Sequence, residues 1–425
     1  MQRKTAIPGK TRDPEGIFMK RKPALIFFTE YYYPAQNTTS YYLTDIIRTA
    51  AADWPGKVKI YTASSLGDQE EILTGENISI VRLSGGNLNK NSLVARLWKF
   101  FLITFKFFWF ALWSISKGDT VFTVTNPAFM LICLSFLRKI RRFNYSLLVY
   151  DIFPEALIPA GLSKENSFSY RLTLKIYNWA YRQVDHLIAI GRDMKEVVAG
   201  KTGSDHNITL IPNWVDVREI QPAGNESNAV LQEYNLYGKR IFSLGGNMGR
   251  TQGLDNLLEA VSSFPGNEKI HFLLMGDGAW GKKIHEFIRQ NPEIPVTYTG
   301  RIKQEWQSAM LNAGDIALIS LAQGMYGISV PSKSYFNMAA GKPLLLIADE
   351  NSEIALLIKE HNLGWVVPPG NSGELSKVIR QIQDLPDEEL KDFALRSRTV
   401  AETYFAKEIV LNQYKEFFAK FHGKI

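Results

Sequence analysis

Two carboxylates follow an apolar run in the first half of the chain. Residues 145–150 have the pattern of a buried strand, and Asp151 and Glu155 come directly after it. Ligands of α/β proteins bind at the carboxyl ends of parallel strands, where a carboxylate can orient a substrate hydroxyl or assist proton transfer. The pattern predicts that Asp151 and Glu155 are catalytic. The competing interpretation makes Asp151 an ordinary cap or loop residue.

A short helix is predicted at residues 332–340, between two apolar strand patterns, and Gly341 and Pro343 end it. A helix N-terminus presents free N–H groups and a positive dipole end to an anion. Ser332 is a favourable N-cap residue, whereas a lysine in the first turn, Lys333, opposes the dipole unless an anion lies beside it. Ser332 and Lys333 therefore indicate an anion site. The alternative is an ordinary helix with a solvated lysine.

A second phosphate-cradle pattern lies at residues 241–255, where a strand leads through a glycine-rich loop into a helix. One such loop is weak evidence for a phosphate-binding site, but two in the same half of the chain are stronger evidence. We expect these loops and the glycines at 275–278 to hold a phosphate-bearing ligand. The predicted ligand-binding residues of this half are Gly246, Asn247, Arg250, Gln252, Gly276, Gly278, Ser332, Lys333 and Asn337.

The first strand pattern, residues 24–28, runs into a loop rich in hydroxyl, amide and aromatic side chains. Its position at a strand's carboxyl end predicts contact with a ligand. A further strand, 120–125, ends at an asparagine that we expect to line the same cleft. The predicted ligand-binding residues of this half are Gln36, Asn37, Thr38 and Asn126. The alternative for the first loop is a helix start capped by Thr38, Thr39 or Ser40.

Residues 93–115 form the most hydrophobic long stretch of the chain, rich in aromatic residues and interrupted by three basic ones. The uninterrupted apolar part is shorter than the roughly 20 residues of a transmembrane helix. Aromatic residues with basic ones along one side favour a helix lying in a membrane surface. The alternatives are a buried core helix and a true span. The predicted membrane contacts are Trp98, Phe101, Phe105, Phe108 and Trp109.

A basic cluster at residues 138–142 is a second candidate for contact with anionic lipid. Its alternative is a solvated helix C-terminus that complements the helix dipole.

Strand and helix patterns alternate through both halves of the chain, which predicts two doubly wound parallel sheets in an α/β protein. A polar stretch at 217–239 marks the domain junction. We expect a disordered tail at 1–22, an N-terminal domain at 23–216, a C-terminal domain at 217–405 and a final helix at 406–425. A long amphipathic helix is predicted over 401–422.

Composition limits the partners and the compartment. The chain has 425 residues, a formal net charge of +7, one cysteine and six histidines. The positive charge favours anionic partners such as nucleotide phosphates or an anionic membrane face. The lone Cys133 fits a reducing compartment, and the scattered histidines have no metal-site spacing. Because the aromatic excess lies in one apolar helix and not along a basic groove, nucleic-acid binding is not expected. No signal peptide pattern is visible.

Taken in order, these motifs resemble the family 4 glycosyltransferases, which have the GT-B architecture of two Rossmann-like domains facing across a cleft. The resemblance covers roughly residues 23–422. The forms that two of its motifs take here, Asn-x-Gly-x-x-Gln-Gly at 247–253 and Pro-Ser-Lys at 331–333, are similar to those of the fucosaminyltransferase-like enzymes of O-antigen and capsule synthesis. The resemblance is carried by 28–39, 149–155, 188–191, 211–216, 245–253, 275–278, 314–315, 330–333 and 338–343.

The resemblance implies a hexosyltransferase of retaining stereochemistry that needs neither a cofactor nor an obligatory metal. It implies that the ligand-binding residues predicted in the C-terminal domain bind a nucleotide-sugar donor, here of the UDP-HexNAc type, and that those of the N-terminal domain bind the acceptor. The acceptor would be a polyprenyl-diphosphate-linked saccharide, which places the enzyme in the cytoplasm on the inner face of the cell membrane. The final helix would return to the N-terminal domain.

The sequence departs from the family at its phosphate and ribose positions. The family's arginine and lysine of the first loop are replaced by Asn247 and Gln252. The paired glutamates are replaced by Ile328 and Phe336, and the N-terminal-domain histidine by Tyr150. We expect Arg250 and Lys333 to replace the missing cations, and Asn337 or a backbone group to replace the ribose carboxylate. Two alternatives stay open: a nucleotide-sugar 2-epimerase, and a non-catalytic partner of another transferase.

Overall fold

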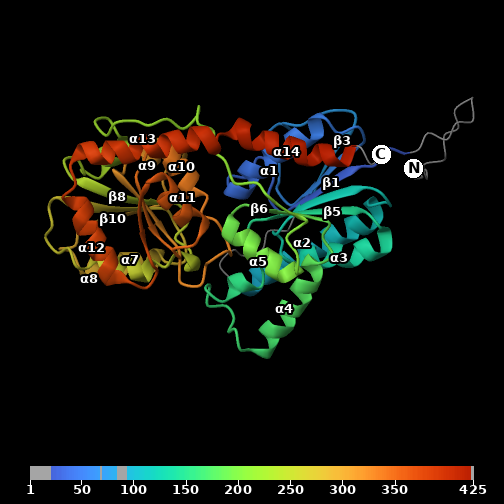
Figure 1. Ribbon diagram of the computed structural model, residues 1–425, viewed down its shortest axis with the longest axis horizontal. Coiled ribbons are helices and arrows are strands. Elements are labelled where there is room, and N and C mark those ends of the chain that lie inside the picture. Colours follow the sequence, from blue (N-terminus) through green and yellow to red (C-terminus); the bar gives the residue numbers. More distant parts are fainter. Residues whose placement is uncertain (1–20, 68, 84–92, 423–425) are drawn as a thin grey trace, which may run out of the picture.

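The computed structural model describes residues 21–67, 69–83 and 93–422 (Figure 1). Most of the predicted tail at 1–22 lies outside the described residues.

The first sheet has seven parallel strands in the order β3-β2-β1-β4-β5-β6-β7. Continuous apolar runs form its central strands, as expected for strands that are covered on both faces. Its elements are β1 (Leu25–Thr29), α1 (Thr38–Ala52), β2 (Val58–Thr62), β3 (Ile78–Arg82), α2 (Leu93–Ser114), β4 (Thr120–Val124), α3 (Phe129–Arg141), β5 (Asn144–Val149), η1 (Glu155–Leu157), α4 (Phe168–Tyr181), β6 (His186–Ala189), α5 (Arg192–Thr202) and β7 (Ile208–Leu210).

The second sheet has six parallel strands in the order β10-β9-β8-β11-β12-β13. Its elements are α6 (Ala229–Glu233), β8 (Arg240–Gly245), η2 (Arg250–Gln252), α7 (Leu254–Val261), β9 (Ile270–Met275), α8 (Gly281–Gln290), β10 (Val296–Gly300), η3 (Gln304–Trp306), α9 (Gln307–Asn312), β11 (Ile316–Ser320), α10 (Lys333–Ala339), β12 (Leu344–Ile347), α11 (Glu353–His361), β13 (Gly364–Val367) and α12 (Ser372–Gln383). The predicted α/β class with two doubly wound sheets is confirmed.

Neighbouring residues of β1 show how the first sheet is covered. Phe27 packs against Phe418, with ring centroids 6.3 Å apart, whereas Phe28 packs against Phe107 of α2 at 5.9 Å. Successive side chains of a strand point to opposite faces. One face of the sheet is therefore covered by α1 and the C-terminal helix, and the other by α2, α3 and α4 (Figure 1).

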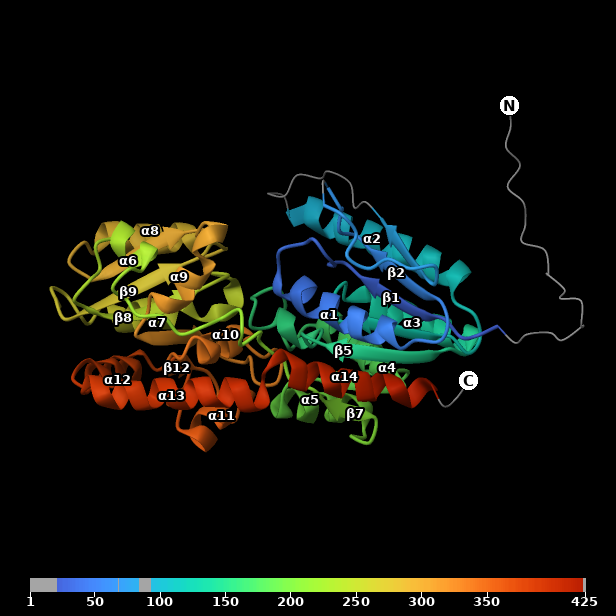
Figure 2. The same ribbon diagram turned by 90° about the horizontal axis from the view of Figure 1, so that it is seen from above.

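The chain ends with two helices, α13 (Asp387–Tyr404) and α14 (Lys407–His422). Figure 2 shows α13 along the second domain and α14 along the first. The predicted return of the last helix to the N-terminal domain is confirmed. The prediction of one unbroken helix over 401–422 is wrong, because the backbone at Phe405 and Lys407 instead exchanges hydrogen bonds of 2.9 and 3.0 Å with Val215.

Backbone contacts also join the domains at the loop between β11 and α10. Asp151 forms an antiparallel bridge with Ser329, and the Ile152 N–H donates to the Ile328 carbonyl at 3.0 Å. The Gly327 N–H donates to the Asp193 carboxylate at 3.3 Å. This loop is therefore held against the strand ends of the first sheet.

Two glycine loops of the second domain fit together without space for side chains. The Gly246 N–H donates to the Met275 carbonyl at 2.7 Å, and the Met248 N–H to the Asp277 carbonyl at 3.0 Å. A Cβ atom on Gly276, whose φ is +142°, would lie 1.7 Å from the Gly246 oxygen. The two loops can approach this closely only while position 276 is glycine.

We expect Gly276→Ala to lower the free energy of unfolding of the second domain by roughly 2–4 kcal/mol, because backbone strain adds to overlap with a neighbouring loop. Gly266→Ala is the matched control, since Gly266 has a φ of +64° and no atom within 4 Å of the added Cβ. Its cost should be about 1 kcal/mol. Thermal and denaturant unfolding would measure both, and equal losses would contradict the close approach of the loops.

Candidate active site

The structure brings three predicted donor-binding residues together. The Lys333 ammonium donates to the Gln252 side-chain oxygen at 3.3 Å. A Cβ on Gly246 would lie 2.7 Å from Lys333 Cε, so the lysine stem runs directly past the glycine. Burial lowers the pKa of Lys333 to about 8. Among the described residues no carboxylate pairs with this ammonium, which leaves a positive charge available to an anionic ligand.

The other predicted residues of the glycine loops pack against one another or lie exposed in the second domain. Gly278 packs against the loop that holds Asn247, since a Cβ there would lie 2.8 Å from the Asn247 amide oxygen. Arg250 begins η2, is exposed, and makes no hydrogen bond or ion pair within the described chain. It is thus a second cation free to turn toward a ligand.

Ser332 is the N-cap residue of α10, as predicted, but it does not cap the helix with its side chain. Its φ and ψ of −58° and −26° are already helical, and its side chain makes no capping bond. A capping hydroxyl reaches the first N–H groups from an extended backbone. Helix α10 also has only 7 residues. The positive charge here comes from the Lys333 side chain and not from a capped helix end.

Asn337 and Phe336 lie on α10 beyond the lysine. Asn337 is buried, and its side chain makes no hydrogen bond to a described residue. The Phe336 ring packs 5.6 Å from Tyr41 of α1 across the domain boundary. The position where the family has a glutamate is therefore used here for packing between the domains.

Asp151 lies at the carboxyl end of β5, where Thr125 holds its backbone. The Thr125 hydroxyl oxygen accepts the N–H groups of Tyr150 and Asp151, both at 3.1 Å. The Asp151 side chain keeps accessible surface, yet protein atoms crowd most of its surroundings, and this loss of hydration raises the pKa of its carboxyl to about 6. It has no ion-pair partner within the described residues. Asn126, half-buried, follows Thr125 at the end of the neighbouring strand.

Glu155 has a different environment. Its carboxylate pairs with the buried ammonium of Lys201 on α5. The same ammonium lies 5.2 Å from the Tyr181 ring centroid. The Glu155 carboxylate thus neutralises the buried Lys201, which gives Glu155 a structural role that Asp151 does not share.

The predicted acceptor residues of the first loop are exposed at the start of α1. The Asn37 side chain accepts the Ser40 N–H at 2.9 Å and caps the helix. The cap is thus Asn37, and not Thr38, Thr39 or Ser40. Gln36 and Thr38 flank it with exposed side chains.

Helix α2 carries a row of exposed aromatic side chains, whereas Ile103, Phe107 and Ala111 on its other side are buried. Phe108, predicted as a membrane contact, is half-buried against the core. The row contains Trp113, 71% exposed, which the prediction missed although it continues the helical spacing of the row. Its members are Trp98, Phe101, Phe105, Trp109 and Trp113.

The row does not stand alone, because α3 packs against α2 and α4 packs against α3. These two helices also expose large apolar side chains, and the three helices contain no aspartate or glutamate. We call this surface the three-helix face. Its contributions from α3 and α4 are Phe129, Phe136, Ile140, Phe168, Leu172 and Ile176. None of the helices in the described chain is long and apolar enough to cross a bilayer.

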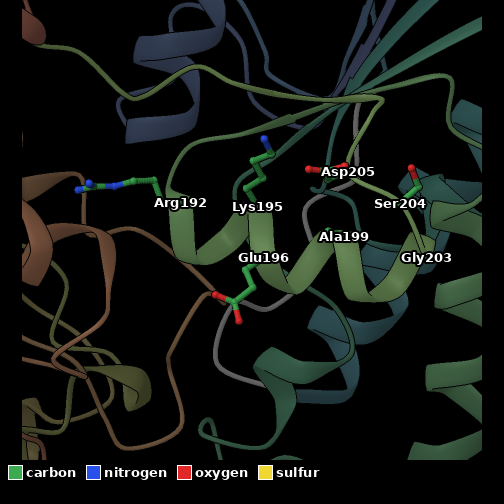
Figure 3. Close-up of a pocket in the computed structure, with 7 residues that line it drawn as sticks. All are labelled: Arg192, Lys195, Glu196, Ala199, Gly203, Ser204 and Asp205. Carbon is green, nitrogen blue, oxygen red and sulfur yellow. The ribbon is translucent and has the colours of Figure 1, made fainter.

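An open pocket of about 470 Å³ lies on the surface of α5, away from these residues (Figure 3). None of the predicted site residues lines it. Its Arg192 pairs with Glu353 at 3.0 Å and with Glu360, and its Glu196 accepts the Tyr326 hydroxyl at 2.8 Å. Since these charges already have partners between the domains, the pocket is not a candidate active site. No group of three or more potential metal ligands occurs in the described part of the chain.

The glycosyl transferases group 1 family matches residues 238–384, which hold the glycine loops and Lys333. The chain is 32% identical over 390 residues to the probable glycosyltransferase WbjE of Pseudomonas aeruginosa, covering 91% of this chain and 95% of that protein. It is 23% identical over 303 residues to the putative colanic acid biosynthesis glycosyl transferase WcaI of Escherichia coli K12, covering 70% and 73%.

Among solved structures, the fold is similar to that of Anabaena HepE in complex with UDP. The TM-score is 0.66 at 16% sequence identity, covering 95% of this chain and all of that one. With two parallel sheets, glycine loops around an unpaired lysine and a relative aligned over nearly its whole length, the chain belongs to the group 1 glycosyltransferases and has the GT-B fold.

Proposed function

We propose that this glycosyltransferase transfers a sugar of the HexNAc type from a UDP-sugar to a polyprenyl-diphosphate-linked saccharide. The reaction retains the anomeric configuration, needs no metal, and serves surface polysaccharide synthesis such as O-antigen or capsule. The observation that carries the proposal is the Lys333 ammonium, which lies half-buried beside a glycine loop without a carboxylate partner in the described chain. UDP in the HepE structure and the name of WcaI support the donor and the pathway.

In this proposal the diphosphate of the donor lies against Gly246 and Lys333. As the bond between the anomeric carbon and the diphosphate breaks, negative charge grows on the leaving oxygen. The fixed ammonium stabilises that charge in a site with little water. Gln252 holds the ammonium in place, and Arg250 adds a second cation. The side chains that differ from the family thus still form a cationic diphosphate site.

Asp151 acts on the acceptor. Its carboxylate accepts a hydrogen bond from the acceptor hydroxyl and takes the proton as the hydroxyl oxygen bonds to the anomeric carbon and the bond from that carbon to the diphosphate breaks. The half-buried Asn126 on the next strand contacts the acceptor sugar, and Asn337 contacts the ribose of the donor. The exposed loop at Gln36, Asn37 and Thr38 borders the acceptor entrance.

The three-helix face places the enzyme on the inner surface of the cell membrane. Its aromatic side chains reach the acyl boundary, and the lysines and arginines of α2 and α3 contact lipid headgroups. A 2-epimerase does not act on a membrane-bound acceptor and has no use for this face. A non-catalytic homologue has no use for an unpaired ammonium in the donor loops.

Replacing Lys333 by methionine should weaken UDP binding by about 10- to 150-fold, because one charge-assisted hydrogen bond is lost. Lys282→Met, which removes an exposed charge in the same domain, should leave affinity for UDP unchanged in calorimetric titration.

The pKa of Lys333 in the protein without ligand is about 8, so affinity for UDP should be highest below pH 8. Above it, affinity falls by up to about tenfold per pH unit, because the ammonium must be protonated to bind. Lys333→Arg should remove this pH dependence, and a wild-type affinity that stays constant above pH 8 would contradict the role.

Asp151→Asn should reduce turnover by about 10²–10⁴-fold and leave UDP affinity nearly intact, since the carboxylate acts on the acceptor. In the wild type, activity should fall as the pH drops below about 6, where the carboxyl becomes protonated. The measurement is formation of lipid-linked product from a panel of UDP-sugars. Glu155→Gln is the comparison: it should lower stability through Lys201 more than it lowers turnover. Full activity of Asp151→Asn would remove its role.

The combined change Phe105→Ser and Trp109→Ser should release the protein from phospholipid vesicles, since each exposed aromatic ring contributes apolar area on insertion. Tyr237→Ser with Leu395→Ser is the matched control, because both side chains are exposed on the second domain. Vesicle flotation measures the bound fraction. Undiminished binding of the first variant would refute membrane contact through α2.

A further inference from the structure

An open cavity of about 600 Å³ lies at the opposite end of the first sheet from Asp151. It is formed where β1 and β2 begin and α2 ends. Four cationic side chains line it, and no carboxylate is among its described lining residues. The proposed function assigns it no role. The lining residues that matter here are Arg21, Lys22, Lys57, Lys59, Asn77 and Trp113.

One of the four charges is already balanced. Arg21 donates to both oxygens of the buried Asp119 carboxylate, at 3.0 and 2.9 Å. The same carboxylate accepts the N–H groups of Ala24 and Ser116, both at 2.8 Å, so its hydrogen-bonding capacity is used. Among the described cations of the cavity, Arg21 alone forms an ion pair with it.

The other three cations, Lys22, Lys57 and Lys59, have no ion-pair partner within the described chain. Lys59 is half-buried, and burial together with the neighbouring charges of Arg21 and Lys57 lowers the pKa of its ammonium. Cations that repel one another around a cavity are stabilised by a bound anion. The charge balance of this cavity therefore favours an anionic ligand.

The position of the cavity indicates which class of anion it binds. Trp113 lines it and is also the last member of the exposed aromatic row of α2. A helix lying in a membrane surface has its aromatic rings at the acyl boundary, directly beside the phosphates of the headgroups. We propose that this cavity binds the phosphate of an anionic phospholipid headgroup. This proposal rests on the membrane contact proposed above.

The test is calorimetric titration of the full chain with dihexanoylphosphatidylglycerol, a short-chain lipid, below its micelle concentration. One lipid should bind per protein. Lys57→Gln with Lys59→Gln should weaken binding by about 30-fold, the effect of two lysines at an anionic headgroup. Arg171→Gln with Lys175→Gln on α4 is the matched control, because it removes the same charge from the three-helix face outside the cavity. That variant should bind the lipid like the wild type.

Equal weakening by the α4 variant would show diffuse attraction to a basic face and would overturn the proposal. Inorganic phosphate bound as tightly as the lipid would make the cavity a free-phosphate site, which also overturns it, as would the absence of any binding. Failure of the proposed function is separate. UDP affinity depends on Lys333 in the other domain, and vesicle flotation of the Phe105 and Trp109 variant tests membrane contact without changing the cavity lysines.

Discussion

The backbone bridge between Asp151 and Ser329 is the contact on which the site depends. It joins the end of β5 in the first sheet to the loop that leaves β11 in the second. Ser329 lies only four residues before Lys333 in the chain. A main-chain contact between the domains therefore sets the position of the proposed acceptor carboxylate relative to the proposed donor lysine. The second crossing, between Val215 and Ala406, holds the opposite side of the domain boundary.

This arrangement explains how a chain without the family's usual cations can still present a charge. Gln252 occupies the position where a lysine is common, and its amide oxygen accepts a hydrogen bond from Lys333. The charge thus comes from α10 and is oriented by the loop, instead of coming from the loop itself. Gly246 has to be small, because the lysine stem fills the space where its side chain would lie.

The fold could be predicted from the sequence because its signals are local. Apolar runs mark the strands, and the residues just after them, such as Asp151 and Gly246, lie at the strand ends where they were expected. Partners distant in sequence could not be predicted. The residues near Glu155 in the sequence do not indicate its ion pair with Lys201. The residue type of Ser332 does not indicate that its backbone is already helical. The break between α13 and α14 likewise depends on Val215, far away in the chain.

The exposed apolar surface could also be predicted only in part from the sequence. The aromatic row of α2 is visible as a pattern within one helix, but the face formed with α3 and α4 exists only after the sheet places those helices side by side. That face and Asp151 belong to the same domain, whereas the glycine loops and Lys333 belong to the other. If the acceptor is anchored in the membrane, the domain that meets the bilayer is also the one that orients the acceptor hydroxyl. The donor domain then needs no membrane contact, and the two bridges between the domains carry the geometric relation between lipid surface and donor site.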